Sequence, residues 1–196
     1  MIHRSALAVS LLLSGVAIAA CSKQAEQPAG NVAEAPAVAE PGAAPQAIAL
    51  NGPDGRPVGT VTLSEDPNGV TIKVDASAIP AGTHGIHLHQ KGLCEGPKFE
   101  SAGSHVKHGG DGAVHGLLNA GGPESGDLPN LYAGADGRAF VEVFTTGAAL
   151  VEGGGGEHLL DADGSAILIH AMADDHAAQP IGGSGDRVAC GVVAAG

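Results

Sequence analysis

Histidine is the residue type that offers the most chemistry in this sequence. The chain has ten His among 196 residues, more than its nine Lys and Arg together. His87 and His89 stand two residues apart, so in a strand both imidazoles would lie on one face and could share a metal ion. Two His on a polar sheet face would give the same pattern, so the pair alone is a weak signal. His84 would face the opposite side and is expected to be structural.

Short strands would position these side chains. Residues 60–63 and 70–74 alternate in polarity and are rich in β-branched side chains, and the sequence DPNG at 66–69 predicts a turn between them. Further strands are predicted at 85–89, 140–144, 166–169 and 188–193. No long amphipathic pattern is present. The fold class is therefore all-β, a sandwich or a barrel.

Two long stretches between the predicted strands, about 91–136 and 145–164, are expected to be loops. Loops of this length in a small domain are usually functional or otherwise anchored. The first stretch contains three further His, several acids and Cys94.

The N-terminal segment has the pattern of a targeting signal. Residues 1–20 carry Arg4 followed by a short apolar run, too short and interrupted for a membrane-spanning helix. The run ends IAAC at Cys21, which resembles a bacterial lipobox and predicts lipidation of Cys21; an ordinary cleaved signal peptide is the alternative. Residues 21–46 then read as a disordered Ala/Pro-rich tether, and residues 47–196 as the folded domain.

The charge and aromatic content exclude some partners. The net charge is −12 at pH 7, and the chain has three Phe, one Tyr and no Trp. An acidic chain is not attracted to phosphate backbones or anionic lipid surfaces, and so few aromatic rings offer no stacking platform for single strands. We therefore expect no nucleic-acid partner.

Seven segments, taken in order, resemble the copper/zinc superoxide dismutases. The first, 85–94 (GIHLHQKGLC), resembles the family's first copper-ligand motif. The others are 101–105 (SAGSH), 115–117 (HGL), 126–130 (GDLPN), 159–161 (LLD), 169–175 (IHAMADD) and 187–192 (RVACGV). The resemblance covers about residues 48–193 and is to the bacterial periplasmic branch. It implies a Greek-key β-barrel, immunoglobulin-like in architecture, with the metals on its outer face under the two long loops.

The resemblance also implies a role for individual residues. The copper ligands would be His87, His89, His105 and His170, and the zinc ligands would include His105 as the bridge, His115 and Asp127. Asp174 would hydrogen-bond one His of each metal, which fixes tautomer and ring orientation. Arg187 would attract and position superoxide. Cys94 and Cys190 would form the family disulfide, which suits an oxidising compartment.

One position departs from the family pattern. Glu124 stands where the bacterial sequences have a third zinc His, and the segment between His105 and His115 is longer than usual. Glu124 is the favoured fourth zinc ligand, since carboxylate oxygen binds zinc. The alternatives are that His108 replaces it or that zinc binds weakly or not at all.

The expected function is that of a superoxide dismutase: it converts superoxide to O2 and H2O2 by Cu(II)/Cu(I) cycling, with His105 as a proton carrier. The protein would lie on the periplasmic side of the cell envelope, lipid-anchored, and Ser22 resembles the signal for the outer membrane. Lys91, Lys98 and Lys107 would either add local positive charge or simply keep the loops soluble. The family includes monomers and dimers, so a homodimer is compatible with the resemblance. The alternative is a non-enzymatic copper-binding or copper-buffering lipoprotein of the same fold.

Overall fold

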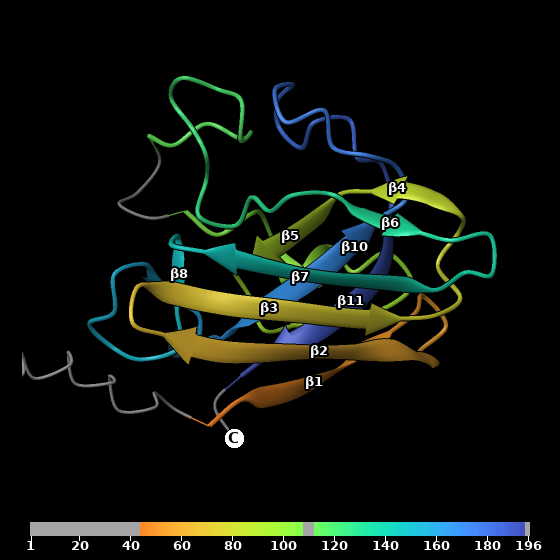
Figure 1. Cartoon of the computed structure of the whole chain (residues 1–196), viewed down its shortest axis with the longest axis horizontal. Helices are drawn as coiled ribbons and strands as arrows, with labels where there is room; N and C mark the ends of the chain where they lie inside the picture. Colours follow the sequence, from red (N-terminus) through yellow and green to blue (C-terminus); the bar gives the residue numbers. More distant parts are fainter. Residues whose placement is uncertain (1–43, 108–111, 195–196) are drawn as a thin grey trace, which may run out of the picture. The chain divides into compact units, whose positions relative to one another are not determined.

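The computed structural model describes residues 44–107 and 112–194, whose regular secondary structure is almost entirely β-strand, joined by long loops (Figure 1). The strands are β1 (Gln46–Asn51), β2 (Pro57–Asp66), β3 (Gly69–Ala76), β4 (Gly82–His84), β5 (Ile86–His89), β6 (Leu131–Ala133), β7 (Ala139–Thr145), β8 (Ala148–Ala149), β9 (Glu157–His158), β10 (Ser165–His170) and β11 (Arg187–Val193). One short 3₁₀ turn, Glu100–Ala102, lies in the long segment after β5.

Nine of these strands form one antiparallel sheet in the order β4-β6-β7-β3-β2-β1-β11-β10-β5. Its two edge strands, β4 and β5, are consecutive in the sequence and are separated only by Gly85. The sheet must therefore curl until its edges meet, which makes a nearly closed barrel. Strands that are neighbours in the sheet, such as β3 and β7 or β1 and β11, are often far apart in the chain, as in a Greek key. The all-β prediction is confirmed.

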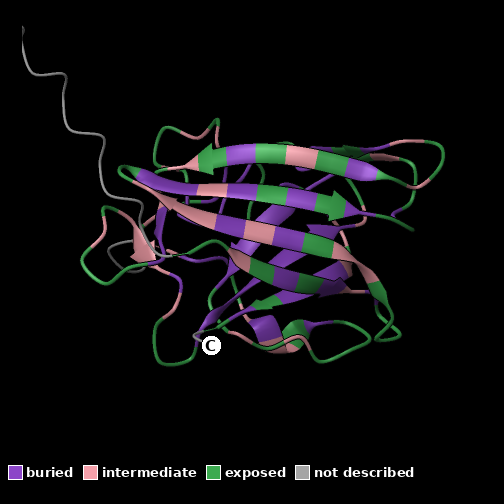
Figure 2. Cartoon of the chain, turned by 60° about the horizontal axis from the view of Figure 1, so that its bottom comes forward, coloured by how far each residue is buried: buried purple, intermediate pink, exposed green. Residues whose placement is uncertain are grey.

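Alternation of side chains gives the barrel its core. Buried residues alternate with exposed or half-buried ones along most of β3 and around Val61 and Leu63 of β2 (Figure 2), as expected for strands with one face on the core and one in water. In β5, Ile86 and Leu88 belong to the core cluster, so His87 and His89 point to the outer side of the barrel.

The outer side of β10 is covered as well, which explains why all six of its residues are buried. Ile167 and Ile169 face the core. Leu168 packs on the opposite side against Phe99 and Cys190, in a smaller cluster under the segment that follows β5. His87 and His89 therefore lie on a sheet face that a long loop shields from water.

The predicted loops need correction. β6 lies inside the first predicted loop, and β8 and β9 pair with each other inside the second. The candidate ligands lie on β5, at the end of β10 and in the segment 91–130, and none lies in 145–164. The second long segment at the site is instead 171–186, between β10 and β11, which the sequence analysis did not single out. It rises beside the segment 112–130 in Figure 1. The described residues also include no helix long and apolar enough to span a bilayer.

Candidate metal centre

Four buried imidazoles converge on the outer face of the barrel. His87 lies opposite Leu168, and His89 opposite Ala166, across the β5–β10 ladder, while His170 ends β10. His105 lies in the segment after β5, where its backbone pairs with that of His89 in an isolated antiparallel β-bridge. One ligand atom from each of these four His lies within 4.8 Å of the others.

The atoms that meet there lack hydrogen-bond partners. They are Nδ1 of His87 and Nε2 of His89, His105 and His170, all buried. A buried polar atom without a partner costs free energy, and four such atoms aimed at one point fit the binding of a metal cation.

The opposite ring nitrogens explain why three of these four atoms carry lone pairs. His89 Nδ1 donates to the Gly103 carbonyl at 2.9 Å, and His170 Nδ1 donates to the Gly185 carbonyl at 3.2 Å. His87 Nε2 donates to Asp174 Oδ2 at 2.8 Å. Each acceptor fixes the ring proton on the far nitrogen, so the inward nitrogen is a metal-binding acceptor.

Burial also keeps two of the rings neutral. Desolvation, followed by the charge of His105, lowers the pKa of His89 to about 2. Desolvation, followed by the charge of His87, lowers the pKa of His170 to about 3. Neutral imidazole is the form that binds metal, so both rings are ready ligands at neutral pH.

A second group of donors begins at the other nitrogen of His105. Its Nδ1 lies 3.1 Å from Asp127 Oδ1, and His115 Nδ1 lies 2.7 Å from the same oxygen. Desolvation disfavours the charged form of His105, but the Asp127 and Glu124 carboxylates outweigh it and raise its pKa. One ring thus faces both groups, as a bridging imidazolate requires.

The backbone orients Asp127 for this second group. The N–H groups of Gly116 and Glu124 donate to its Oδ2 at 2.7 Å and 2.9 Å. Burial opposes the ionised form of Asp127, but hydrogen bonds from His105 and Gly116 outweigh burial and lower the pKa. Oδ1 is therefore the anionic oxygen left for a cation.

Glu124 lies at the edge of the second group. The four residues with mutually close ligand atoms are His87, His105, His115 and Asp127, and Glu124 is not among them. His87, however, uses Nε2 on Asp174 and has only Nδ1 to offer, which already faces the first group. Glu124 Oε2, 3.0 Å from His105 Nδ1 and buried, is the donor placed to complete the second group.

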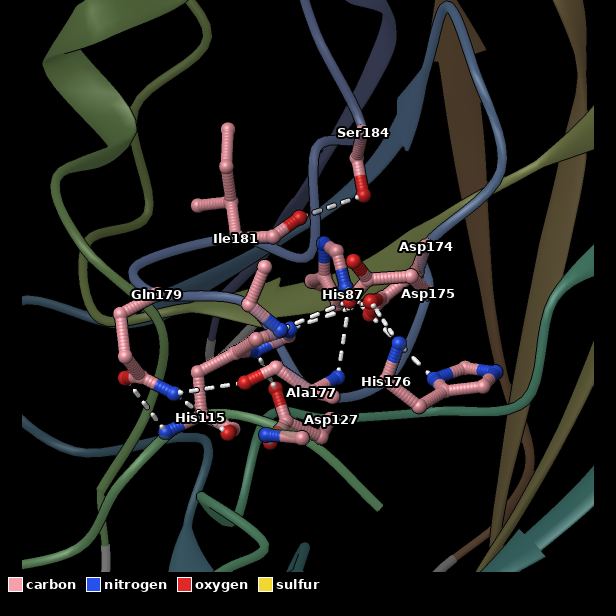
Figure 3. Close-up of polar contacts among 12 residues, drawn as sticks. His87, His115, Asp127, Asp174, Asp175, His176, Ala177, Gln179, Ile181 and Ser184 are labelled. Carbon is pink, nitrogen blue, oxygen red and sulfur yellow. Dashed lines mark hydrogen bonds and ion pairs between the residues drawn. The ribbon is translucent and has the colours of Figure 1, made fainter. Parts of the chain in front are cut away.

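Asp174 joins the two groups from the segment 171–186. Its Oδ2 accepts from His87 and its Oδ1 from His115 Nε2 at 3.1 Å (Figure 3). Burial raises the pKa of Asp174, but hydrogen bonds from His87, the His176 N–H and His115 outweigh this and leave it well below its usual range. The expectation that one carboxylate serves one His of each metal group matches this geometry.

Arg187 lies next to the first group. It is the ladder partner of His170, and its guanidinium donates to the carbonyls of Phe99 at 2.5 Å and Gly103 at 2.7 Å. The Gly103 carbonyl also accepts from His89. Burial lowers the pKa of Arg187, but guanidinium stays charged at any physiological pH. A half-buried cation is thus fixed beside the unpaired imidazole nitrogens.

The comparisons with known proteins agree with this geometry. The family model for copper/zinc superoxide dismutase (SODC) matches residues 58–193. The chain belongs to the copper/zinc superoxide dismutase family. It is therefore an enzyme of the copper/zinc superoxide dismutase type, and copper and zinc are its cofactors. The four-His group suits copper, and the mixed imidazole–carboxylate group suits zinc.

Individual relatives include both dismutases and dismutase-like proteins. "Superoxide dismutase [Cu-Zn]" of Caulobacter vibrioides is 51% identical over 140 residues, 71% of this chain and 80% of that protein. "Superoxide dismutase-like protein YojM" of Bacillus subtilis is 34% identical over 193 residues, 97% of this chain and 96% of that protein. The crystal structure of a SOD-like protein from Bacillus subtilis superposes with a TM-score of 0.71 at 37% identity, covering 76% of this chain and 99% of that one.

The disulfide that the family resemblance implied is present. Cys94 and Cys190 are bonded, which ties the segment after β5 to β11 three residues from Arg187. The copper/zinc superoxide dismutase resemblance was needed for this prediction, because the two Cys are 96 residues apart.

Some supporting residues were missed by the sequence analysis. Asn130 accepts from the Asp174 N–H at 2.9 Å and donates to the Asp174 carbonyl at 2.8 Å. The Gln179 side chain likewise forms two hydrogen bonds with the His115 backbone, accepting from its N–H at 3.2 Å and donating to its carbonyl at 2.8 Å. Asn130 lies in the segment 126–130 (GDLPN), which resembles the family, whereas nothing in the sequence indicated a role for Gln179.

Other predicted residues fall beside the site or outside the described part. His84 is buried, with its ring nitrogens 2.7 Å from the carbonyl oxygens of His170 and Pro80, in keeping with a structural role. His108, the alternative zinc ligand, and Cys21 both lie outside the described residues.

Proposed function

We propose that this chain disproportionates superoxide, with copper held by Nδ1 of His87 and Nε2 of His89, His105 and His170. The single observation that carries the proposal is the convergence of these four buried, unpaired nitrogens. Zinc would be held by His105 Nδ1, His115 Nδ1, Asp127 Oδ1 and Glu124 Oε2. The distances are 3.0 Å from Glu124 Oε2 to His105 Nδ1, 3.1 Å from His105 Nδ1 to Asp127 Oδ1, and 2.7 Å from Asp127 Oδ1 to His115 Nδ1. Donors around one tetrahedral zinc ion would lie about 3.3 Å apart.

Bound copper would supply the one-electron Cu(II)/Cu(I) couple that disproportionation needs, and zinc, which has no redox chemistry, would hold the bridge. The protein's own groups do the rest. Two superoxide ions and two protons give O2 and H2O2. Arg187 offers a fixed positive charge to the anion, and His105 Nε2 can take up and return one of the two protons.

Replacement of Arg187 tests whether the site is catalytic. The Arg187→Ala protein should bind copper as before, since Arg187 contacts no unpaired imidazole nitrogen. Its superoxide consumption per bound copper should fall about tenfold or more, because a hydrogen bond to a charged group contributes about 1.5–3 kcal/mol. Arg187→Lys, which keeps the charge, should retain more activity. Equal activity in all three proteins would contradict a role for Arg187 in the reaction.

A non-enzymatic copper-buffering protein of the same fold is the second candidate. It is favoured by Glu124 in place of a His and by the 34% identity to a protein named superoxide dismutase-like over nearly the full chain. A buffer would bind copper with the same four His and yet consume no superoxide in the wild type. Superoxide decay and copper content, measured on one sample, separate the two candidates.

The proposed location is the periplasmic side of the cell envelope, through a lipid on Cys21 and a tether of residues 21–46. The lipobox-like sequence and the disulfide, which forms in oxidising compartments, support this proposal. Full-length protein should sediment with membranes and incorporate labelled fatty acid, and Cys21→Ser should abolish both. Soluble wild-type protein without label would contradict the anchor. Whether the domain also forms a homodimer stays a prediction for sedimentation to test.

A further inference from the structure

The segment 105–107 is held between β5 and the residues before β6. The Val106 N–H donates to the Leu88 carbonyl, and the Gly126 N–H donates to the Val106 carbonyl, both at 2.9 Å. Val106 faces the core. Because side chains of an extended segment alternate, His105 and Lys107 point together to the other side, toward Glu124.

Glu124 divides its two oxygens between these neighbours. Oε2 lies 3.0 Å from His105 Nδ1, and Oε1 lies 3.0 Å from Lys107 Nζ. The side chain of Glu124 is only 7% exposed, whereas that of Lys107 is 32% exposed. A hydrogen bond from the Glu124 N–H to Asp127, and one from the Asp127 N–H to the Glu124 carbonyl, also fix the Glu124 backbone. Only side-chain rotation is then left, and Lys107 restrains it.

Charge gives Lys107 a second role. Counted apart from the bridging His105, a zinc ion with two imidazoles and one carboxylate carries one net positive charge. Exchanging one imidazole for the Glu124 carboxylate removes that charge and places two buried carboxylates next to each other. The Lys107 ammonium restores one positive charge and, at 3.0 Å, forms a charge-assisted hydrogen bond with the added carboxylate.

We propose that Lys107 is a positioning residue of the zinc site, which aims Glu124 Oε2 at the metal and offsets the charge that Glu124 adds. This inference rests on the proposed function, because it takes Glu124 as a zinc ligand. Glu124 and Lys107 together would then do what a single His does elsewhere in the family.

The test measures zinc affinity by chelator competition on the copper-loaded protein. Lys107→Met should weaken zinc binding about tenfold, and Lys107→Arg should stay within about threefold of wild type. Lys73→Met is the matched control: Lys73 on β3 forms a 2.8 Å ion pair with Glu142 on β7, and both side chains are about half exposed. This control should leave zinc affinity unchanged.

The Glu124→His background provides the decisive comparison. There Lys107 has no carboxylate to orient, so Lys107→Met should have no effect on zinc affinity. The absorption spectrum of Co(II) in the zinc site should also change with Lys107→Met in the wild-type background only. An equal loss of affinity in both backgrounds, or no loss in either, would overturn the proposal.

Two further readouts separate this inference from the proposed function. If Glu124→Gln leaves zinc affinity unchanged, Glu124 is not a ligand, and the zinc assignment and the Lys107 proposal both fail. If the coupling between Lys107 and Glu124 is found in a protein that consumes no superoxide, the proposed function fails and the role of Lys107 stands.

Discussion

At the scale of single residues, the acceptor behind each imidazole decides which nitrogen is free for metal. Carbonyls of Gly103 and Gly185 set the tautomers of His89 and His170, and the Asp174 carboxylate sets that of His87. A ligand's outer partner is therefore as much a part of the centre as the ligand.

Asp174→Asn tests this argument. The amide cannot accept from both His87 and His115 while its NH2 group faces one of them, so one ring loses its acceptor. We expect copper or zinc affinity to fall by about 10–100-fold, measured by chelator competition. Asp175→Asn is the neighbouring control, since the Asp175 carboxylate accepts from the Ala177 and Ala178 N–H groups and from neither His87 nor His115 in the described part of the chain. Equal metal affinity in wild type and Asp174→Asn would contradict the assigned role.

The depressed pKa values of His89 and His170 predict how the metal-free protein responds to acid. A His whose folded pKa lies below the unfolded value of about 6.5 takes up a proton on unfolding, so stability falls as pH drops below 6.5. Each of the two should cost about 2 kcal/mol of stability between pH 7 and pH 5. His105, whose pKa is raised, acts in the opposite direction in this range.

Denaturant unfolding of the metal-free, disulfide-bonded protein at pH 7 and pH 5 measures the effect. The wild type should be less stable at pH 5, and the His89→Gln, His170→Gln double variant should lose less stability over the same interval. The same pH dependence in both proteins would show that these two rings do not cause it.

At the scale of elements, the disulfide and Arg187 join the segment after β5 to β11. Cys190 lies on β11, and Arg187 on the same strand reaches back to Phe99 and Gly103 in that segment. The loop that shields the His cluster is thus fixed at two places, one covalent and one charged.

Removing the disulfide should loosen the fold and the site together. The bond closes a loop across 96 residues, which the chain-entropy model values at about 4–5 kcal/mol of unfolding free energy, often less in practice. We expect Cys94→Ser/Cys190→Ser to unfold at lower denaturant concentration than wild type. An unchanged midpoint at unchanged slope would contradict this expectation.

The sequence predicted some elements well and others not at all. β2, β3, β7 and β10 were predictable because β-branched and apolar residues alternate between clear turns. β6 was missed because three residues, Leu131–Ala133, show no periodicity, and β8 is the dipeptide Ala148–Ala149. Such elements exist only because neighbouring strands supply their hydrogen bonds.

The site divides in the same way. The shared face of His87 and His89 follows from strand geometry, whereas His105, His115 and Asp174 were placed by family resemblance. The contact between Lys107 and Glu124 and the shared Gly103 carbonyl were not predictable, because both depend on how distant segments pack.

At the scale of the whole molecule, the metal ligands come from parts of the chain that are far apart in the sequence. β5, the end of β10 and the segment 91–130 each contribute, and the segment 171–186 contributes Asp174 behind them. Metal ions would act as cross-links among these parts, so their binding free energy adds to folding stability.

Metal removal should therefore destabilise the domain. A ligand present at 100 times its Kd stabilises the folded state by about 2.7 kcal/mol, and two metals contribute separately. Thermal unfolding with and without chelator should show a clear drop in Tm on metal removal, reversed by adding copper and zinc. A Tm that does not respond to the metals would contradict binding at a site built across these segments.

The net charge of −12 repels an anionic substrate overall, so positive charges close to the metal site must attract it. At 0.1 M salt, charges more than about 10 Å away are largely screened. Arg187 lies at the site, and bound metals would add their own positive charge there. Substrate attraction should therefore be judged at physiological salt, where the distant charges count least.

Superoxide decay catalysed by the copper- and zinc-loaded protein tests the central claim most directly. The measurement is made at 0.1 M salt with excess EDTA, which chelates copper not bound to the protein and removes its contribution to superoxide decay. The His87→Ala/His89→Ala double variant serves as control. We expect consumption that is proportional to wild-type protein and absent in the control. Decay no faster than the spontaneous reaction, from wild-type protein with copper bound, would contradict the proposed dismutase function.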